Sequence, residues 1–117
     1  MDLATSVVDQ LIAVTLIGRT SQARAQRRAM LTEALAATEA GLSQARPGWT
    51  GEPVAGASGL WVDTHEDAVA LAEHGKRDGL KLAAGPAFCT YGGQETYLRL
   101  PVWHDPEQLI SALRRLA

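Results

Sequence analysis

The sequence predicts an α+β fold, in which helices pack on one face of a small antiparallel or mixed sheet of about three strands. The first 45 residues repeat apolar side chains with the three- and four-residue spacing of helices, whereas short segments after residue 59 alternate apolar and polar residues as strands do. The 117 residues, 46% hydrophobic and 21% charged, have an ordinary globular composition. We therefore expect a single domain over 1–117, with a helical segment (1–45), a loop (46–59) and a small α+β domain (60–117).

Two helices are expected in the N-terminal segment. The first has one apolar stripe and ends at Gly18; the stripe consists of Leu3, Val7, Leu11, Val14 and Ile17. Thr20 or Ser21 can cap a second, alanine-rich helix that runs to about Gly41 or Gln44. One face of this helix carries Met30, Leu31, Ala34, Leu35 and Thr38. The other carries Arg24, Arg27 and Arg28 without interleaved aromatic residues, which favours a solvated face or a subunit contact over nucleic-acid binding.

The C-terminal part begins with a strand and a helix. Segment 46–59 is rich in glycine and proline, which predicts a loop. After it, Leu60 and Val62 alternate with Trp61 and Asp63 in a short strand. Thr64 and Asp67 resemble a capping box, with Thr64 as the cap of a third helix that ends between Gly75 and Gly79.

Two more strands and a last helix complete the order α-α-β-α-β-β-α. Leu80–Ala84 forms a strand that leads into a turn at Gly85-Pro86, and Thr96–Pro101 forms the next strand. Asp105 followed by Pro106 is a strong helix start. The aliphatic strand residues Leu60, Val62, Leu80, Leu82, Leu98 and Leu100 should face the helices. The opposite face should carry Trp61, Lys81, Ala83, Tyr97 and Arg99, and its half-apolar character predicts that something else normally covers it.

Arg99 is the candidate functional residue. A guanidinium on a strand is held more firmly than one on a loop, and its planar fork matches a carboxylate in bidentate geometry. The turn at Gly85-Pro86 and the strand of Arg99 together predict a site for a small acid. The competing interpretation is an arginine on the solvated face of an edge strand.

Other chemistry is weakly supported by the sequence. A net charge of −2 gives no global attraction to nucleic acid or to an anionic membrane. Cys89 is the only cysteine, and the histidines His65, His74 and His104 are scattered, so neither an internal disulfide nor a metal site is expected. We find no phosphate-binding loop and no catalytic triad, and thus expect no catalytic, cofactor-binding or metal-binding residues. The apolar stretch from Val7 to Ile17 is too short to span a bilayer, so we expect a cytoplasmic protein that does not bind membranes.

Nearly the whole chain resembles the aminotransferase-like region of GntR-type transcription regulators of the MocR subfamily. Ser58–Asp63 resembles the "aGLhlwv" strand of fold-type-I aminotransferases, and Leu80–Phe88 is similar to their "gv.v.PGs.F" segment. Thr96–Leu100 resembles "nflRLsf", and the final helix resembles "eieeGlrrLa". One departure is that Gly85-Pro86 stands where the family has Pro-Gly.

The resemblance implies the C-terminal small domain of a pyridoxal-phosphate fold, acting in effector binding and oligomerisation. By its position in the motif, Arg99 would bind the carboxylate of an amino-acid effector or substrate. The lysine and phosphate-binding residues that hold pyridoxal phosphate would belong to a missing large domain. DNA binding would belong to a missing N-terminal winged-helix domain of a homodimeric parent. The chain alone would then not be an enzyme. Two alternatives stay open: the small domain of a class I/II aminotransferase, and a free-standing module that binds a carboxylate or a protein.

Overall fold

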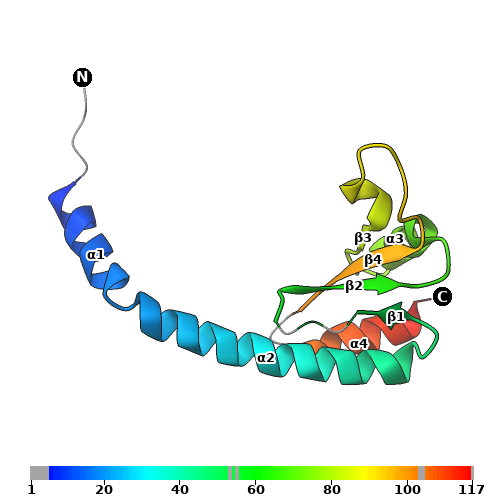
Figure 1. Ribbon diagram of the computed structural model, residues 1–117, viewed down its shortest axis with the longest axis horizontal. Coiled ribbons are helices and arrows are strands. Elements are labelled where there is room, and N and C mark those ends of the chain that lie inside the picture. The colour runs from blue at the N-terminus through cyan, green and yellow to red at the C-terminus, as the bar shows by residue number, and fades with distance from the viewer. Residues whose placement is uncertain (1–5, 53, 55, 103–104, 117) are drawn as a thin grey trace. The chain divides into compact units, whose positions relative to one another are not determined.

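The computed structural model describes residues 6–52, 54, 56–102 and 105–116 (Figure 1). It forms two compact units, residues 1–30 and 31–117, and each is described by itself. Among the described residues, no helix combines the length and the apolar character that are needed to cross a membrane.

The first unit contains the helix α1 (Val7–Ile17) and the start of α2 (Thr20–Ala45). As the sequence predicts, α1 ends at Gly18, whose amide donates to the Val14 carbonyl at 3.1 Å. No residue of α1 is buried, and its large apolar side chains are between 52% and 70% exposed. The prediction of a single apolar stripe is wrong for α1, because its apolar residues are distributed around the whole helix. Leu3 lies outside the described residues.

The second unit is built on an antiparallel sheet in the order β1-β2-β4-β3. Its strands are β1 (Thr50–Gly51), β2 (Gly59–Asp63), β3 (Ala83–Ala84) and β4 (Tyr97–Pro101). The prediction of an α+β fold is confirmed, but the sheet has four strands rather than about three. The additional strand, β1, lies inside the segment 46–59 that the sequence predicts as a loop, because two residues are too few to show an alternating pattern.

Two short helices follow β2 and β4. α3 (Ala68–Arg77) is capped by Asp67, whose carboxylate accepts from the amides of Val69 and Ala70 at 3.0 Å. The prediction of Thr64 as this cap is wrong, because its hydroxyl instead donates to the Thr96 carbonyl at 2.7 Å. α4 (Pro106–Arg115) begins as predicted, with the Asp105 carboxylate accepting from the Gln108 amide at 3.2 Å.

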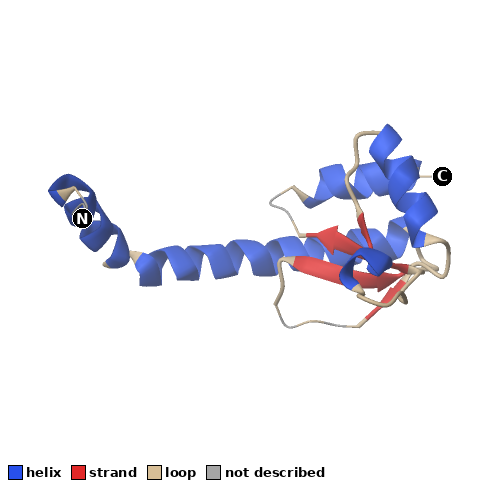
Figure 2. Cartoon of the chain, turned by 90° about the horizontal axis from the view of Figure 1, so that it is seen from above, coloured by secondary structure: helices blue, strands red, loops and turns tan. Residues whose placement is uncertain are grey.

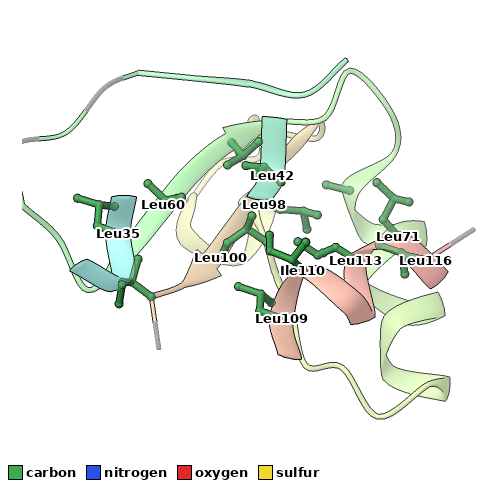
Figure 3. Packing of buried hydrophobic residues seen from close by; sticks show 14 residues of the cluster. Leu35, Leu42, Leu60, Leu71, Leu98, Leu100, Leu109, Ile110, Leu113 and Leu116 are labelled. Carbon is green, nitrogen blue, oxygen red and sulfur yellow. The ribbon is translucent and has the colours of Figure 1, made fainter. Parts of the chain in front are cut away.

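Helices cover one face of the sheet, as the sequence predicts. Figure 1 shows β2 and β4 beside the C-terminal half of α2 and α4, and Figure 2 shows the strands grouped together. Leucines dominate the layer between the helices and the sheet (Figure 3), and Leu98, Leu100 and Leu113 are fully buried there. The sheet is therefore held by burial on one side, which leaves the opposite side available for binding.

Arg46 joins the end of α2 to the end of α4. Its Nε and Nη2 atoms donate to the Leu113 carbonyl at 3.1 and 3.0 Å, and its guanidinium lies 5.3 Å from the centre of the Trp49 ring. The same carbonyl also accepts from the Leu116 amide at 3.3 Å, so the two bonds from Arg46 add to the C-terminal cap of α4. These contacts give Arg46 a structural role at the junction of α2 and α4.

The turn before β4 depends on Gly85, which begins the short helix η1 (Gly85–Phe88). A Cβ atom there would overlap the carbonyl oxygen of Gln94, a residue that is itself held at a φ of 61°. Gly85→Ala should therefore cost about 1–3 kcal/mol of unfolding free energy, the usual cost of overpacking. Urea unfolding should show this loss, and Gly48→Ala is the control because a Cβ there meets no atom within 4 Å. Equal midpoints for the two variants would contradict the prediction.

Candidate functional site

Arg99 lies near the middle of the sheet face that the helices leave open. It belongs to β4, whose partner residues on the two sides are Trp61 of β2 and Ala83 of β3. Because β4 is an inner strand, the interpretation of Arg99 as part of an edge strand is wrong. The side chain is nevertheless exposed. Arg99 is thus a charged group fixed by two neighbouring strands, with its head group accessible from one side.

Gly59 sets the position of the Arg99 head group. A Cβ on Gly59 would lie 2.9 Å from both the Cζ and Nη2 atoms of Arg99, so the guanidinium occupies the space that a side chain would take. Among the described residues, no hydrogen bond or ion pair engages this guanidinium. Its five N–H groups are therefore free to bind an acceptor from outside the described part of the chain.

Three aromatic rings form a cluster around Trp61, the β2 residue that pairs with Arg99. The Trp61 indole stacks on Tyr97, with ring centres 5.5 Å apart and an angle of 18° between their planes. Phe88 of η1 meets the same indole edge to face, at 5.5 Å and 81°. The structure thus brings together four residues that the sequence predicts on this face, namely Trp61, Ala83, Tyr97 and Arg99. Lys81 precedes β3, outside the sheet.

Sequence reasoning missed the roles of Gly59 and Phe88. Gly59 is two residues before Trp61, so the two-residue period of a strand places it on the Trp61 face. Its proximity to Arg99 depends on the register between β2 and β4, which no local pattern reports. Phe88 belongs to a turn that carries no periodic signal, and it reaches the sheet through the fold of η1.

Asp63 ends β2 and organises the turn that follows it. Its Oδ1 atom accepts from the His65 amide at 2.9 Å and lies 3.5 Å from the His65 Nδ1 atom. The His65 Nε2 atom is 3.0 Å from the Thr50 hydroxyl, so this group of side chains links β1 to the end of β2. Hydrogen bonds from the Thr96 side chain, the His65 amide and the Tyr97 side chain, together with the His65 charge, lower the pKa of Asp63 and outweigh the effect of desolvation.

The lowered pKa of Asp63 predicts a pH dependence of stability. A carboxylate whose folded pKa lies below its unfolded value stabilises the fold above the unfolded pKa, about 4, and loses that contribution as the pH falls through the folded value. The melting temperature of Asp63→Asn should therefore be lower than that of wild type at pH 7. The difference between the two melting temperatures should narrow as the pH falls below about 4. Melting curves across this range test it, with the exposed Glu33→Gln as the control. A constant difference between Asp63→Asn and wild type would contradict the prediction.

Three cavities are lined by described residues of the second unit. One, of about 380 Å³, lies between α2 and the strands β1 and β2; another, of about 470 Å³, lies between α2 and α4; and a third, of about 300 Å³, lies between the end of α3 and α4. Arg99 lines none of these three. Among the described residues, the candidate site is therefore part of the exposed sheet face and not of these three cavities.

The remaining candidates are dispersed. Arg24, Arg27 and Arg28 are exposed on α2, Cys89 is a free thiol of intermediate burial, and His104 lies outside the described residues. Within the described residues, no three acidic, histidine or cysteine side chains are grouped to hold a metal ion.

The residues present do not fit pyridoxal phosphate. That cofactor needs a lysine amine beside a phosphate-binding loop. The chain has only Lys76 and Lys81, which are exposed and line none of the three cavities. If the cofactor acts with this chain, its binding groups come from another polypeptide segment.

Two comparisons with known proteins were made by sequence. No family model matches the chain, and no curated protein matches it. The function is therefore inferred from Arg99 and the residues around it.

Proposed function

We propose that this chain is the C-terminal effector-binding and oligomerisation domain of a GntR-type regulator of the MocR subfamily, with an aminotransferase-like fold. In this proposal Arg99 binds the carboxylate of an amino-acid effector, and the chain alone is not catalytic. The observation that carries the proposal is the Arg99 guanidinium, which is exposed on an inner strand and forms no hydrogen bond or ion pair with a described residue. A bidentate pair with a carboxylate suits such a fixed fork.

Two further features support the proposal. The antiparallel sheet with helices on one face is the architecture that the family resemblance implies for the small domain. The open face has an arginine but no enclosing wall, which is the arrangement expected when a second domain supplies the other half of a binding site.

The parent protein would supply what this chain lacks. A large aminotransferase-like domain would hold pyridoxal phosphate and close over Arg99, and an N-terminal winged-helix domain would bind DNA. The parent would be a cytoplasmic homodimer. These assignments follow from the resemblance, and the net charge of −2 supports placing DNA binding outside this chain.

We also expect the isolated chain to self-associate. The apolar side chains of α1, such as Leu11 at 64% and Ile17 at 70% exposure, favour burial by about 25 cal/mol per Å², reduced by the cost of association. Sedimentation at micromolar concentrations should show a concentration-dependent mass, and Leu11→Gln should shift it toward the monomer. Glu33→Gln is the matched control on α2. A monomer at every concentration would count against this expectation.

The in-frame coding sequence upstream of Met1 tests the proposed function, followed by a DNA-binding assay on the full-length product. The proposal predicts a winged helix, then a large domain with a cofactor-binding lysine, and DNA binding that changes when an amino acid is added. A large domain without a winged helix would replace the proposal by an aminotransferase. A coding sequence that begins at Met1 would replace it by a free-standing module.

A further inference from the structure

The rings beside Arg99 are a feature that carboxylate binding alone does not require. Trp61 lies directly opposite Arg99 in the pairing of β2 with β4, and its indole is 38% exposed. Phe88, whose ring meets that indole edge to face, is 56% exposed. Rings that serve only to stabilise a fold tend to be buried, so this degree of exposure beside an unpaired cation points to a ligand.

We propose that the carboxylate ligand of Arg99 also carries an aromatic ring, and that this ring packs on the cluster formed by Trp61, Tyr97 and Phe88. The inference rests on the proposed role of Arg99 and narrows its ligand to aryl carboxylates. The ligand carries one carboxylate, and a short aliphatic chain separates the ring from it.

The spacing along β2 sets the length of that chain. The guanidinium lies over Gly59, and Trp61 is two residues further along the same strand. Strand residues rise by about 3.3 Å each, so the bound carboxylate and the indole are separated by roughly 7 Å. A ring joined to its carboxylate by two or three carbon atoms spans this separation.

Charge fixes the orientation of the ligand. Asp63 is two residues beyond Trp61 on β2, and its cross-strand partner is Tyr97. Its carboxylate disfavours a second anion at that end of the ring cluster, while Arg99 attracts one at the Gly59 end. On the other side of Arg99, Ala83 presents only a methyl group, which offers no charge that would compete for the guanidinium.

The expected gain from the ring is moderate. An additional aromatic pair in stacked or edge-to-face geometry strengthens an interaction by roughly two- to tenfold in affinity beyond the burial of its area. A saturated ring of similar size provides the burial but not the quadrupole interaction. The difference between an aromatic and a saturated ligand therefore isolates the contribution of the cluster.

The test titrates the full-length protein with three matched probes and follows binding by calorimetry. The probes are phenylpropionate, cyclohexylpropionate, which has a saturated ring, and phenylpropionamide, which lacks the charge. We expect phenylpropionate to bind about two- to tenfold more tightly than cyclohexylpropionate and at least about tenfold more tightly than the amide. Trp61→Leu and Phe88→Leu should each reduce the preference for the aromatic ring, whereas Tyr91→Leu, at a side chain 99% exposed, should retain it.

The outcomes separate this inference from the proposed function. Equal affinities for the two carboxylates, both lost in Arg99→Ala, would overturn the aromatic inference and leave the role of Arg99 intact. An aromatic preference that persists in both Trp61→Leu and Phe88→Leu would also overturn it. If no carboxylate binds, or if Arg99→Ala binds as wild type does, both claims fail. The comparison of probes on the wild-type chain needs no variant, so a folding defect in Trp61→Leu leaves the test valid.

Discussion

Replacing Arg99 by alanine should weaken binding of the amino-acid effector to the full-length protein by roughly 2–5 kcal/mol, or tens- to thousands-fold in affinity. The reason is that a bidentate pair between a guanidinium and a carboxylate in a closed site is lost whole. Arg99→Lys should recover little, because an ammonium cannot reproduce the planar fork. Calorimetric titration measures both variants, using the common amino acid that most raises the melting temperature of wild type.

Stability separates this role from that of a solvated arginine. Arg99→Ala should change the unfolding free energy by no more than about 0.5 kcal/mol, because the side chain is exposed and forms no hydrogen bond or ion pair with a described residue. Arg114→Ala, at an exposed arginine in the last turn of α4, is the control and should bind as wild type does. Equal affinities in wild type, Arg99→Ala and Arg99→Lys would end the carboxylate assignment.

Among the substitutions proposed for this chain, replacing Leu98 by alanine should cause the largest loss of unfolding free energy. Leu98 is fully buried on β4, next to Arg99 in the sequence and on the opposite face of the strand. Truncating such a leucine removes its transfer free energy and leaves a cavity, at a cost of about 2–5 kcal/mol. Urea unfolding should show this loss, with a fall in Tm on the order of 10–20 °C.

Val69→Ala provides the comparison for Leu98→Ala, because Val69 is 47% exposed on α3. The unfolding free energy of Val69→Ala should stay within about 0.5 kcal/mol of the wild-type value. If the two variants were equally stable, Leu98 would not be a core residue and the assigned faces of β4 would be reversed, which would also displace Arg99 from the open face.

Local patterns predicted much of this fold. Gly18 and Asp105 mark helix boundaries because the ends and caps of a helix depend on a few adjacent residues. The faces of β2 and β4 followed from alternation, which is strict where one side of a sheet is buried. The strand predicted over Leu80–Ala84 shrank to Ala83–Ala84, because only those residues pair with β4.

The candidate site was predicted only in part, because its geometry is non-local. That Arg99 lies on the open face follows from the two-residue period of its strand. The contact of its guanidinium with Gly59 depends on the register of two strands that are separated by the 33 residues 64–96. The choice of Asp67 rather than Thr64 as a helix cap was equally decided by a distant partner, the Thr96 carbonyl.

The most direct test of the central claim is the Arg99 side-chain Nε–H resonance of the isotope-labelled full-length protein during titration with a small monocarboxylate. Binding at the guanidinium predicts a saturable shift of this resonance, and no comparable shift for Arg114 or Arg115 on α4. The matching amide should leave all three resonances unchanged, because it carries no charge for the fork to bind. If the Arg99 resonance stays in place, or moves only in parallel with those of Arg114 and Arg115, Arg99 is not a carboxylate site.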